Sequence, residues 1–175
     1  MASELHVDAI KHSGGTSALT ITSGGVVHIP GHVIQTQTLS RVRTGTTSGS
    51  STSAVILNDG VGNFELAITP KFSTSKIIGS VSICGVVSTT TVKSIAVLVY
   101  RNGSFLQYLE SHLGYSSSNT GERHHFGACF VDSPNSTSAQ TYSFYGQGNG
   151  GSYIYFDTHV SGNVSNSIIL QEIAQ

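Results

Sequence analysis

Residues 93–110, KSIAVLVYRNGSFLQYLE, decide the fold. The run 93–101 is apolar on both faces of an extended strand, as expected for a central strand of a sandwich. Asn102-Gly103 follows, and this pair favours a two-residue type I′ turn because both positions of that turn need a positive φ. Residues 104–110 are then predicted to run back antiparallel to the first strand. The stretch therefore predicts a β-hairpin within an antiparallel sheet.

Strand signals recur on both sides of this hairpin, with turns rich in Ser, Asn and Gly between them. Residues 64–69 alternate and stop at Pro70, and every second residue from Ile77 to Val87 is apolar or Gly, which predicts one buried face of a long strand. Further strands are predicted over residues 124–131, 139–146, 152–160 and 165–173. About eight to ten short strands are typical of antiparallel sandwiches and jelly rolls. We therefore predict an all-β chain with an antiparallel β-sandwich or jelly roll over residues 32–175.

Residues 1–31 differ from this body. Two strand-like runs, 18–22 and 26–29, flank Ser23-Gly24-Gly25, which predicts a short β-hairpin. A lone hairpin is marginal in water, so neighbouring surface, from the following domain or from copies of the chain, must cover its apolar side chains. We predict that residues 1–31 are a segment for attachment or trimerisation, with contacts made by Leu5, Val7, Leu19, Ile21, Val27 and Ile29.

The composition excludes several classes of function. Only 10% of the residues are charged and the net charge is -1, so the chain lacks the basic footprint of a nucleic-acid-binding protein. The longest strongly apolar run, 95–100, is far shorter than the ~20 residues of a transmembrane helix, so no membrane insertion is expected. Met1 is not followed by a charged and then an apolar segment, so a secretory signal is not expected. With 28 Ser, 18 Thr and 20 Gly, the surface is expected to be hydrated mainly by hydroxyl and amide groups.

No catalytic motif is present, and the nine acidic residues are spread thinly along the chain. We predict a protein that is not an enzyme and that holds no cofactor and no metal. Histidine is the one reactive type in excess, and a sandwich could still gather His112, His124 or His159, or a threefold axis could gather copies of one histidine. Cys84 and Cys129 fall inside apolar strand patterns, which predicts buried free thiols.

Tyrosines beside Ser-, Gly- and Asn-rich segments favour a binding role. Tyr offers rigid amphipathic contact area while its small polar neighbours offer adaptable hydrogen bonds, and aromatic rings beside hydroxyl and amide groups also suit stacking on sugars. In the predicted strand 152–160, alternation places Tyr153, Tyr155, Asp157 and His159 on the face away from the core. The candidate ligand-binding residues are Tyr115, Tyr145, Tyr153, Tyr155, Asp157 and His159.

Five short segments carry a resemblance: SELHVDAI (3–10), ALTITSGGVVHIP (18–30), TPKFSTSKI (69–77), DSPNSTSAQTY (132–142) and IILQEIAQ (168–175). The first two resemble the leader of tail-fibre and virion structural proteins of tailed bacteriophages, particularly marine and cyanobacterial ones. The other three are similar to the "TPxxxxSKI", "DxPxTTSAxTY" and "ITLMEIA" segments of those proteins. The matches are spread along most of the chain, from residue 3 to residue 175, in the same order.

The resemblance implies a homotrimeric fibre or knob with a jelly-roll body and no enzyme activity, and it supplies no site residues to carry over. Long tail fibres run to many hundreds of residues, whereas here the leader joins the terminal domain directly. We therefore expect a short fibre or adhesin, made in the host cytoplasm and exposed on the virion. Its partners would be its own copies, other virion proteins through residues 1–31, and a host-surface glycan or protein. The alternative is a capsid- or tail-decorating (cement or collar) protein with no receptor role.

Overall fold

The computed structural model describes residues 7–15, 17–42, 53–58, 61–88, 93–116, 122–148, 155–156 and 165–175. Within these residues the chain forms strands joined by turns and bends, without a helix. All of the strand pairs are antiparallel. The prediction of an all-β antiparallel fold is therefore confirmed.

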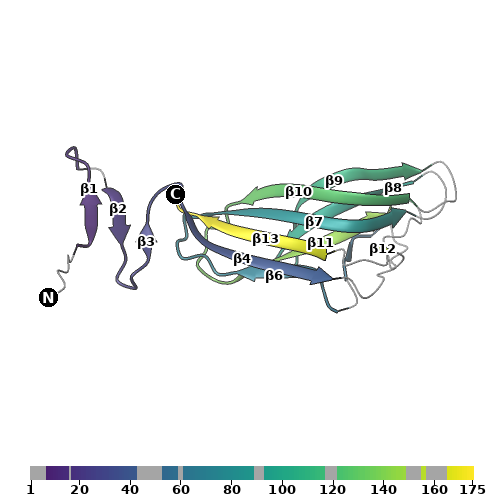
Figure 1. The fold of residues 1–175 in the computed structure, drawn as a ribbon, viewed down its shortest axis with the longest axis horizontal. Coiled ribbons are helices and arrows are strands. Elements are labelled where there is room, and N and C mark those ends of the chain that lie inside the picture. The colour runs from purple at the N-terminus through teal and green to yellow at the C-terminus, as the bar shows by residue number, and fades with distance from the viewer. Residues whose placement is uncertain are drawn as a thin grey trace.

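Three sheets are present (Figure 1). The small N-terminal sheet has the order β1-β2-β3, with β1 (Ala9–Lys11), β2 (Ser17–Ile21) and β3 (Val27–His28). The second sheet has the order β10-β7-β13-β4, and β12 pairs with β7; its strands are β4 (Val33–Val42), β7 (Lys76–Ser88), β10 (Glu122–Asp132), β12 (Tyr155–Phe156) and β13 (Ser165–Ile173). The third sheet has the order β5-β11-β8-β9, and β6 pairs with β11; its strands are β5 (Val55–Ile56), β6 (Glu65–Ile68), β8 (Lys93–Arg101), β9 (Ser104–Ser116) and β11 (Gln140–Gly148).

The pairing of the second and third sheets is nested. The hairpin β8–β9 is innermost, and outside it lie in turn the pairs β7–β10, β6–β11 and β4–β13. Successive pairs alternate between the two sheets, so the chain winds around itself as one long folded ribbon. This alternation of nested antiparallel pairs is the jelly-roll topology, and the predicted jelly roll is confirmed.

The core lies between these two sheets, and the alternation of each strand supplies it. On β7 the inward residues Ile77, Val81 and Ile83 are buried, and on β8 the inward residues are Ile95, Val97 and Val99. Aromatic side chains are part of this core, in which Phe130 packs against Tyr142 and Phe144 with ring centroids 5.4 and 6.2 Å apart. Gly79 is the cross-strand partner of Phe130, and a Cβ at Gly79 would overlap that ring. Gly79 in the alternating pattern of residues 77–87 therefore makes room for the ring of Phe130.

The decisive hairpin forms as predicted at its turn. Asn102 and Gly103 have φ values of 50° and 79°, and Arg101 pairs with Ser104. Every residue from 95 to 99 is buried, which confirms that β8 is covered on both faces. Beyond the turn the register shifts several times, because β9 contains more residues than β8 over the same length. These shifts are β-bulges.

The small sheet contains the predicted hairpin, since β2 pairs with β3 around a turn in which Gly25 has a φ of 76°. A third strand, β1, extends it on the other side of β2. The sheet lies beyond the end of the sandwich where the C-terminal residue of the structure is found (Figure 1). Division of the chain into domains 1–31 and 32–175 stays a prediction.

Contacts across this junction involve few residues. Gly31 donates its backbone N–H to the carbonyl oxygen of Ala174, and Ala174 donates to His32. The ring of His28 packs edge-on against Phe72 with centroids 4.6 Å apart, and its Nε2 lies 3.0 Å from the backbone oxygen of Gln175. The small sheet is therefore tied to the sandwich through the end of β13 and the turn before β7.

Candidate functional site

Four aromatic side chains gather on the outer face of the third sheet. The rings of Tyr100 and Tyr145 lie with centroids 4.0 Å apart and an interplanar angle of 31°. Phe105 packs edge-on against Tyr100 at 5.7 Å and against Tyr108 at 5.2 Å. Phe105 and Tyr108 are 50% and 53% exposed. We call these four residues the aromatic surface.

The strand pattern explains why these rings point outward. Ile95, Val97 and Val99 face the core, so Leu98 and Tyr100 lie on the opposite face of β8. On β11 the same logic places Tyr145 outward, since its neighbour Phe144 is in the core. Leu98 pairs with both Tyr108 and Tyr145 and is buried on this outer face. The aromatic surface therefore has an apolar floor.

A bulge in β9 brings Phe105 and Tyr108 to the same face. Residues three apart in a regular strand point to opposite faces. Tyr100 pairs with Phe105, but Val99, which precedes Tyr100, pairs with Gln107. β9 therefore holds one additional residue, Leu106, at this point. Leu106 turns inward against the core, and both aromatic rings remain outside.

Polar groups border the rings. The hydroxyl of Tyr108 donates to Oε1 of Gln147 at 3.4 Å. Ser143, two residues before Tyr145 on β11, donates its hydroxyl to Oε2 of Glu65 at 2.8 Å. Burial, the neighbouring Tyr100 and the carboxylate of Glu65 together raise the pKa of Tyr145, so its hydroxyl stays protonated and able to donate at neutral pH.

The structure describes only some of the candidate residues predicted from the sequence. Tyr145 is part of the aromatic surface. Tyr115 lies in β9 and Tyr155 in β12, but the structure does not describe their side chains. Tyr153, Asp157 and His159 lie outside the described residues, as does Leu5 of the attachment set. The ligand-binding role of these residues stays a prediction.

The sequence reasoning missed Tyr100, Phe105 and Tyr108. The prediction selected tyrosines in or near Ser-, Gly- and Asn-rich segments, whereas these three rings come from two adjacent strands joined by the Asn102-Gly103 turn. The turn itself places Tyr100 opposite Phe105, so that pair could have been found by counting outward from it. The position of Tyr108 depends on the bulge.

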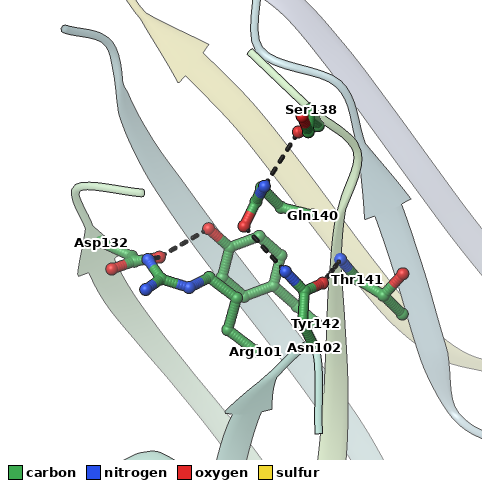
Figure 2. Close-up of polar contacts among 7 residues, drawn as sticks. All are labelled: Arg101, Asn102, Asp132, Ser138, Gln140, Thr141 and Tyr142. Carbon is green, nitrogen blue, oxygen red and sulfur yellow. Dashed lines mark hydrogen bonds and ion pairs between the residues drawn. The ribbon is translucent and has the colours of Figure 1, made fainter. Parts of the chain in front are cut away.

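A polar network closes the end of the sandwich near that turn (Figure 2). Oδ2 of Asp132 accepts a hydrogen bond from the hydroxyl of Tyr142 and pairs with Arg101, both at 2.7 Å. Asn102 donates its side-chain amide to Gln140 and accepts from the backbone N–H of Thr141. Burial, aided by the hydrogen bond to Asp132, raises the pKa of Tyr142 strongly. The carboxylate is occupied by its two partners, so we assign this network to folding rather than to catalysis.

A second buried carboxylate, Glu172, organises the turn between β6 and β7. Its Oε1 accepts from the backbone N–H groups of Lys71 and Phe72 at 2.7 and 3.2 Å and from the hydroxyl of Ser75 at 2.7 Å. Its Oε2 accepts from the side-chain amide of Gln35 at 2.6 Å. Hydrogen bonds to a charged acceptor are stronger than neutral ones, so this side chain holds the turn that contacts the small sheet.

Cys129 and His125, on the outer face of β10, each contact a serine of β7. Sγ of Cys129 lies 3.3 Å from the hydroxyl of Ser80, and Nε2 of His125 lies 3.1 Å from that of Ser82. The prediction of buried thiols is wrong for Cys129, which is exposed because it occupies an outward position of β10; Cys84 is half-buried. Burial raises the pKa of the Cys84 thiol, which makes it less reactive.

No group of three or more His, Cys, Asp or Glu side chains that could hold a metal ion is found where the structure describes the chain. His112 and His124 lie in β9 and β10, but their side chains, and all of His159, are outside the described set. The described residues also contain no helix long and apolar enough to cross a membrane.

The outer face of the second sheet has a different character. Across its strands run the rows Ser40-Ser167-Ser82 and Thr38-Ile169-Ser80-Cys129. Ile169 is 38% exposed, and Val131, further along β10, is 57% exposed. None of these residues carries a formal charge. We call this face the hydroxyl surface.

In the small sheet, the described members of the predicted attachment set are partly or largely uncovered. Val7, Leu19, Ile21 and Ile29 are half-buried, and Val27 is 42% exposed. Ile10 of β1, which the prediction did not include, is 52% exposed. The attachment role of these residues stays a prediction.

Comparison with known proteins finds matches among solved structures. No protein-family model and no curated protein sequence matches the chain. Among solved structures, the VP2 subviral particle of infectious bursal disease virus has a TM-score of 0.48 at 11% identity, over 94% of this chain and 37% of that one. The Gt strain of that virus gives a TM-score of 0.45 at 10% identity, over 97% of this chain and 43% of the other. The chain thus spans about two fifths of the length of these proteins, and the proposals below rest on its own residues.

Proposed function

We propose that the chain is a non-enzymatic structural protein of a bacteriophage virion, a homotrimeric short fibre or adhesin. In this proposal the small N-terminal sheet assembles with its copies and attaches to the particle, and the jelly roll faces outward and contacts the host. The resemblance of five segments to phage tail-fibre and virion proteins supports the class. Two of those segments supply Asp132 with Tyr142 and Glu172, whose hydrogen bonds hold this fold together.

The observation that carries the proposal is that the jelly roll has a buried core whereas the small N-terminal sheet leaves apolar side chains exposed. The jelly roll buries its own core, whereas no residue of the small sheet belongs to that buried cluster. A sheet of three short strands needs a packed hydrophobic face to be stable in water, and Ile10 and Val27 remain about half exposed. Association of identical chains would bury these side chains by mass action.

Host contact is assigned to the aromatic surface, because it combines exposed rings with hydrogen-bonding neighbours. The alternative, a decoration protein without a receptor, is favoured by one observation, namely the hydroxyl surface. Its small uncharged side chains would allow close packing on a capsid or tail subunit without burying an unpaired charge.

Analytical ultracentrifugation of the full chain at micromolar concentration tests the assembly. We expect the mass of a trimer, and we expect the double variant Ile10→Asp/Val27→Asp to sediment as a monomer because it buries two charges at the contact. Val61→Asp is the matched control, since Val61 is 63% exposed in the jelly roll; it should remain trimeric. A folded monomer of the unmodified chain would contradict the proposal.

A further inference from the structure

We infer that the aromatic surface is a binding site for a neutral glycan, with hexopyranose rings stacked on Phe105 and Tyr108. The inference rests on the host-contact part of the proposed function and names the class of molecule contacted. It assigns binding to strand residues Tyr100, Phe105, Tyr108 and Tyr145.

Exposure and rigidity point to a ligand. The other large hydrophobic side chains exposed on the described part of the jelly roll, such as Val33, Val61 and Val131, are aliphatic and of a kind common on protein surfaces. Phe105 and Tyr108 are instead exposed side by side and held by edge-on packing. An aromatic ring that is already ordered loses little entropy when a ligand binds.

The chemistry around the rings suits a sugar. A hexopyranose has an apolar face of C–H groups and a rim of hydroxyls, so its site needs a ring to stack on and hydrogen-bonding groups beside it. The hydroxyl of Tyr108 and the amide of Gln147 lie at one side of the cluster. Ser143 and Glu65 lie beside Tyr145 at the other. A mixed surface of this kind fits a sugar better than the continuous apolar core of a protein interface.

The charge of the site selects neutral sugars. The carboxylate of Glu65 accepts a hydrogen bond from Ser143, two residues before Tyr145 on β11, so a negative charge lies at this side of the rings. The cation in the nearby network, Arg101, is paired with Asp132 at 2.7 Å. A uronic acid or sialic acid on these rings would therefore meet a like charge, which disfavours binding.

The test uses the full chain and immobilised oligosaccharides. The neutral probes are maltohexaose, cellohexaose and mannohexaose, and the acidic probe is oligogalacturonate. We expect binding to at least one neutral probe and at least tenfold weaker binding to the acidic one. Because the chain has seven Tyr and no Trp, a change in tyrosine fluorescence on binding gives a second readout.

Variants locate the site. Phe105→Ala/Tyr108→Ala should weaken binding by about tenfold or more, as expected for the loss of two ring contacts. Val131→Ala, with similar exposure on the other sheet, should bind as the unmodified chain does. Circular dichroism shows whether the variants fold, and Tyr108→Phe provides a milder test of the hydroxyl.

The outcomes separate this inference from the proposed function. No binding to any neutral probe, or equal binding to the acidic one, overturns the inference. The same follows if Val131→Ala weakens binding as much as the double variant does. The proposed function is tested independently by the trimer mass and by adsorption to host cells, and it stands if those hold while the glycan result fails.

Discussion

The two outer faces of the jelly roll share one core and differ in everything they present to solvent. The aromatic surface on the third sheet holds Tyr100, Phe105, Tyr108 and Tyr145 in mutual contact. The hydroxyl surface on the second sheet presents rows of Ser and Thr with scattered aliphatic side chains. Alternation within each strand fixes the inner face and leaves the outer face free to vary. The side chains on the two outer faces, and not those of the shared core, are therefore expected to determine what each face binds.

The largest loss of stability is expected from Glu172→Ala, because Glu172 holds the turn that joins β6 of the third sheet to β7 of the second sheet. The substitution leaves the backbone N–H groups of Lys71 and Phe72 and the hydroxyl of Ser75 without this acceptor, while the amide of Gln35 keeps its hydrogen bond to the carbonyl oxygen of Thr69. Each buried donor left unpaired costs about 1–3 kcal/mol. We expect a loss of at least about 3 kcal/mol in the free energy of unfolding, measured by chemical denaturation.

Gln171→Ala is the control for that experiment. Gln171 is the neighbour of Glu172 on β13 and points to the outer face, so its loss should cost less than about 0.5 kcal/mol. Equal effects of the two substitutions would show that the buried carboxylate does not hold the end of the sandwich.

Gly79→Ala should cause the next largest loss of stability. It should also affect the two outer faces unequally. A methyl group at this position overlaps the ring of Phe130, and overpacking of a core costs about 1–3 kcal/mol. Phe130 precedes Val131 on β10, so the hydroxyl surface should be disturbed more than the aromatic surface. Hydrogen exchange measured by mass spectrometry should show faster exchange in β7 and β10 than in β8 and β11; the reverse pattern would refute this.

High pH should produce the smallest loss of stability, and this loss should grow gradually as the pH rises. Folding raises the pKa of Tyr142 and Tyr145 above the unfolded value of about 10. The stabilisation from keeping them neutral is therefore complete below about pH 10 and is lost as the pH rises above it, by up to about 1.4 kcal/mol per pH unit for Tyr142. Denaturation measured from pH 8 to 11 should show this decline, and Tyr142→Phe should reduce it more than Tyr145→Phe. A flat profile would contradict the burial of Tyr142.

Local signals were enough to predict much of the fold. Asn102-Gly103 specified its turn through the φ preference of each residue, and the strand 165–173 was predicted with the bounds observed for β13. Strand order depends on pairs far apart in the chain. Glu172 binds Lys71 across 101 positions of sequence, and no local pattern reports such a contact. The short strand β5, with only two residues, also lacks a pattern of its own.

The candidate site was predicted less well for a related reason. Tyr145 was found because it lies beside a glycine-rich segment, whereas Phe105 and Tyr108 are three residues apart and would point to opposite faces of a regular strand. The extra residue in β9 reverses that expectation. Bulge positions depend on packing between the sheets, since Leu106 turns inward to the core, and this cannot be read from alternation.

Electron cryomicroscopy of virions that carry this protein is the most direct test of the account. We predict three copies around a threefold axis, with the small N-terminal sheets at the particle and the aromatic surface of each jelly roll open to solvent. A single copy per site, or an aromatic surface packed against another virion subunit while the hydroxyl surface faces solvent, would contradict the account.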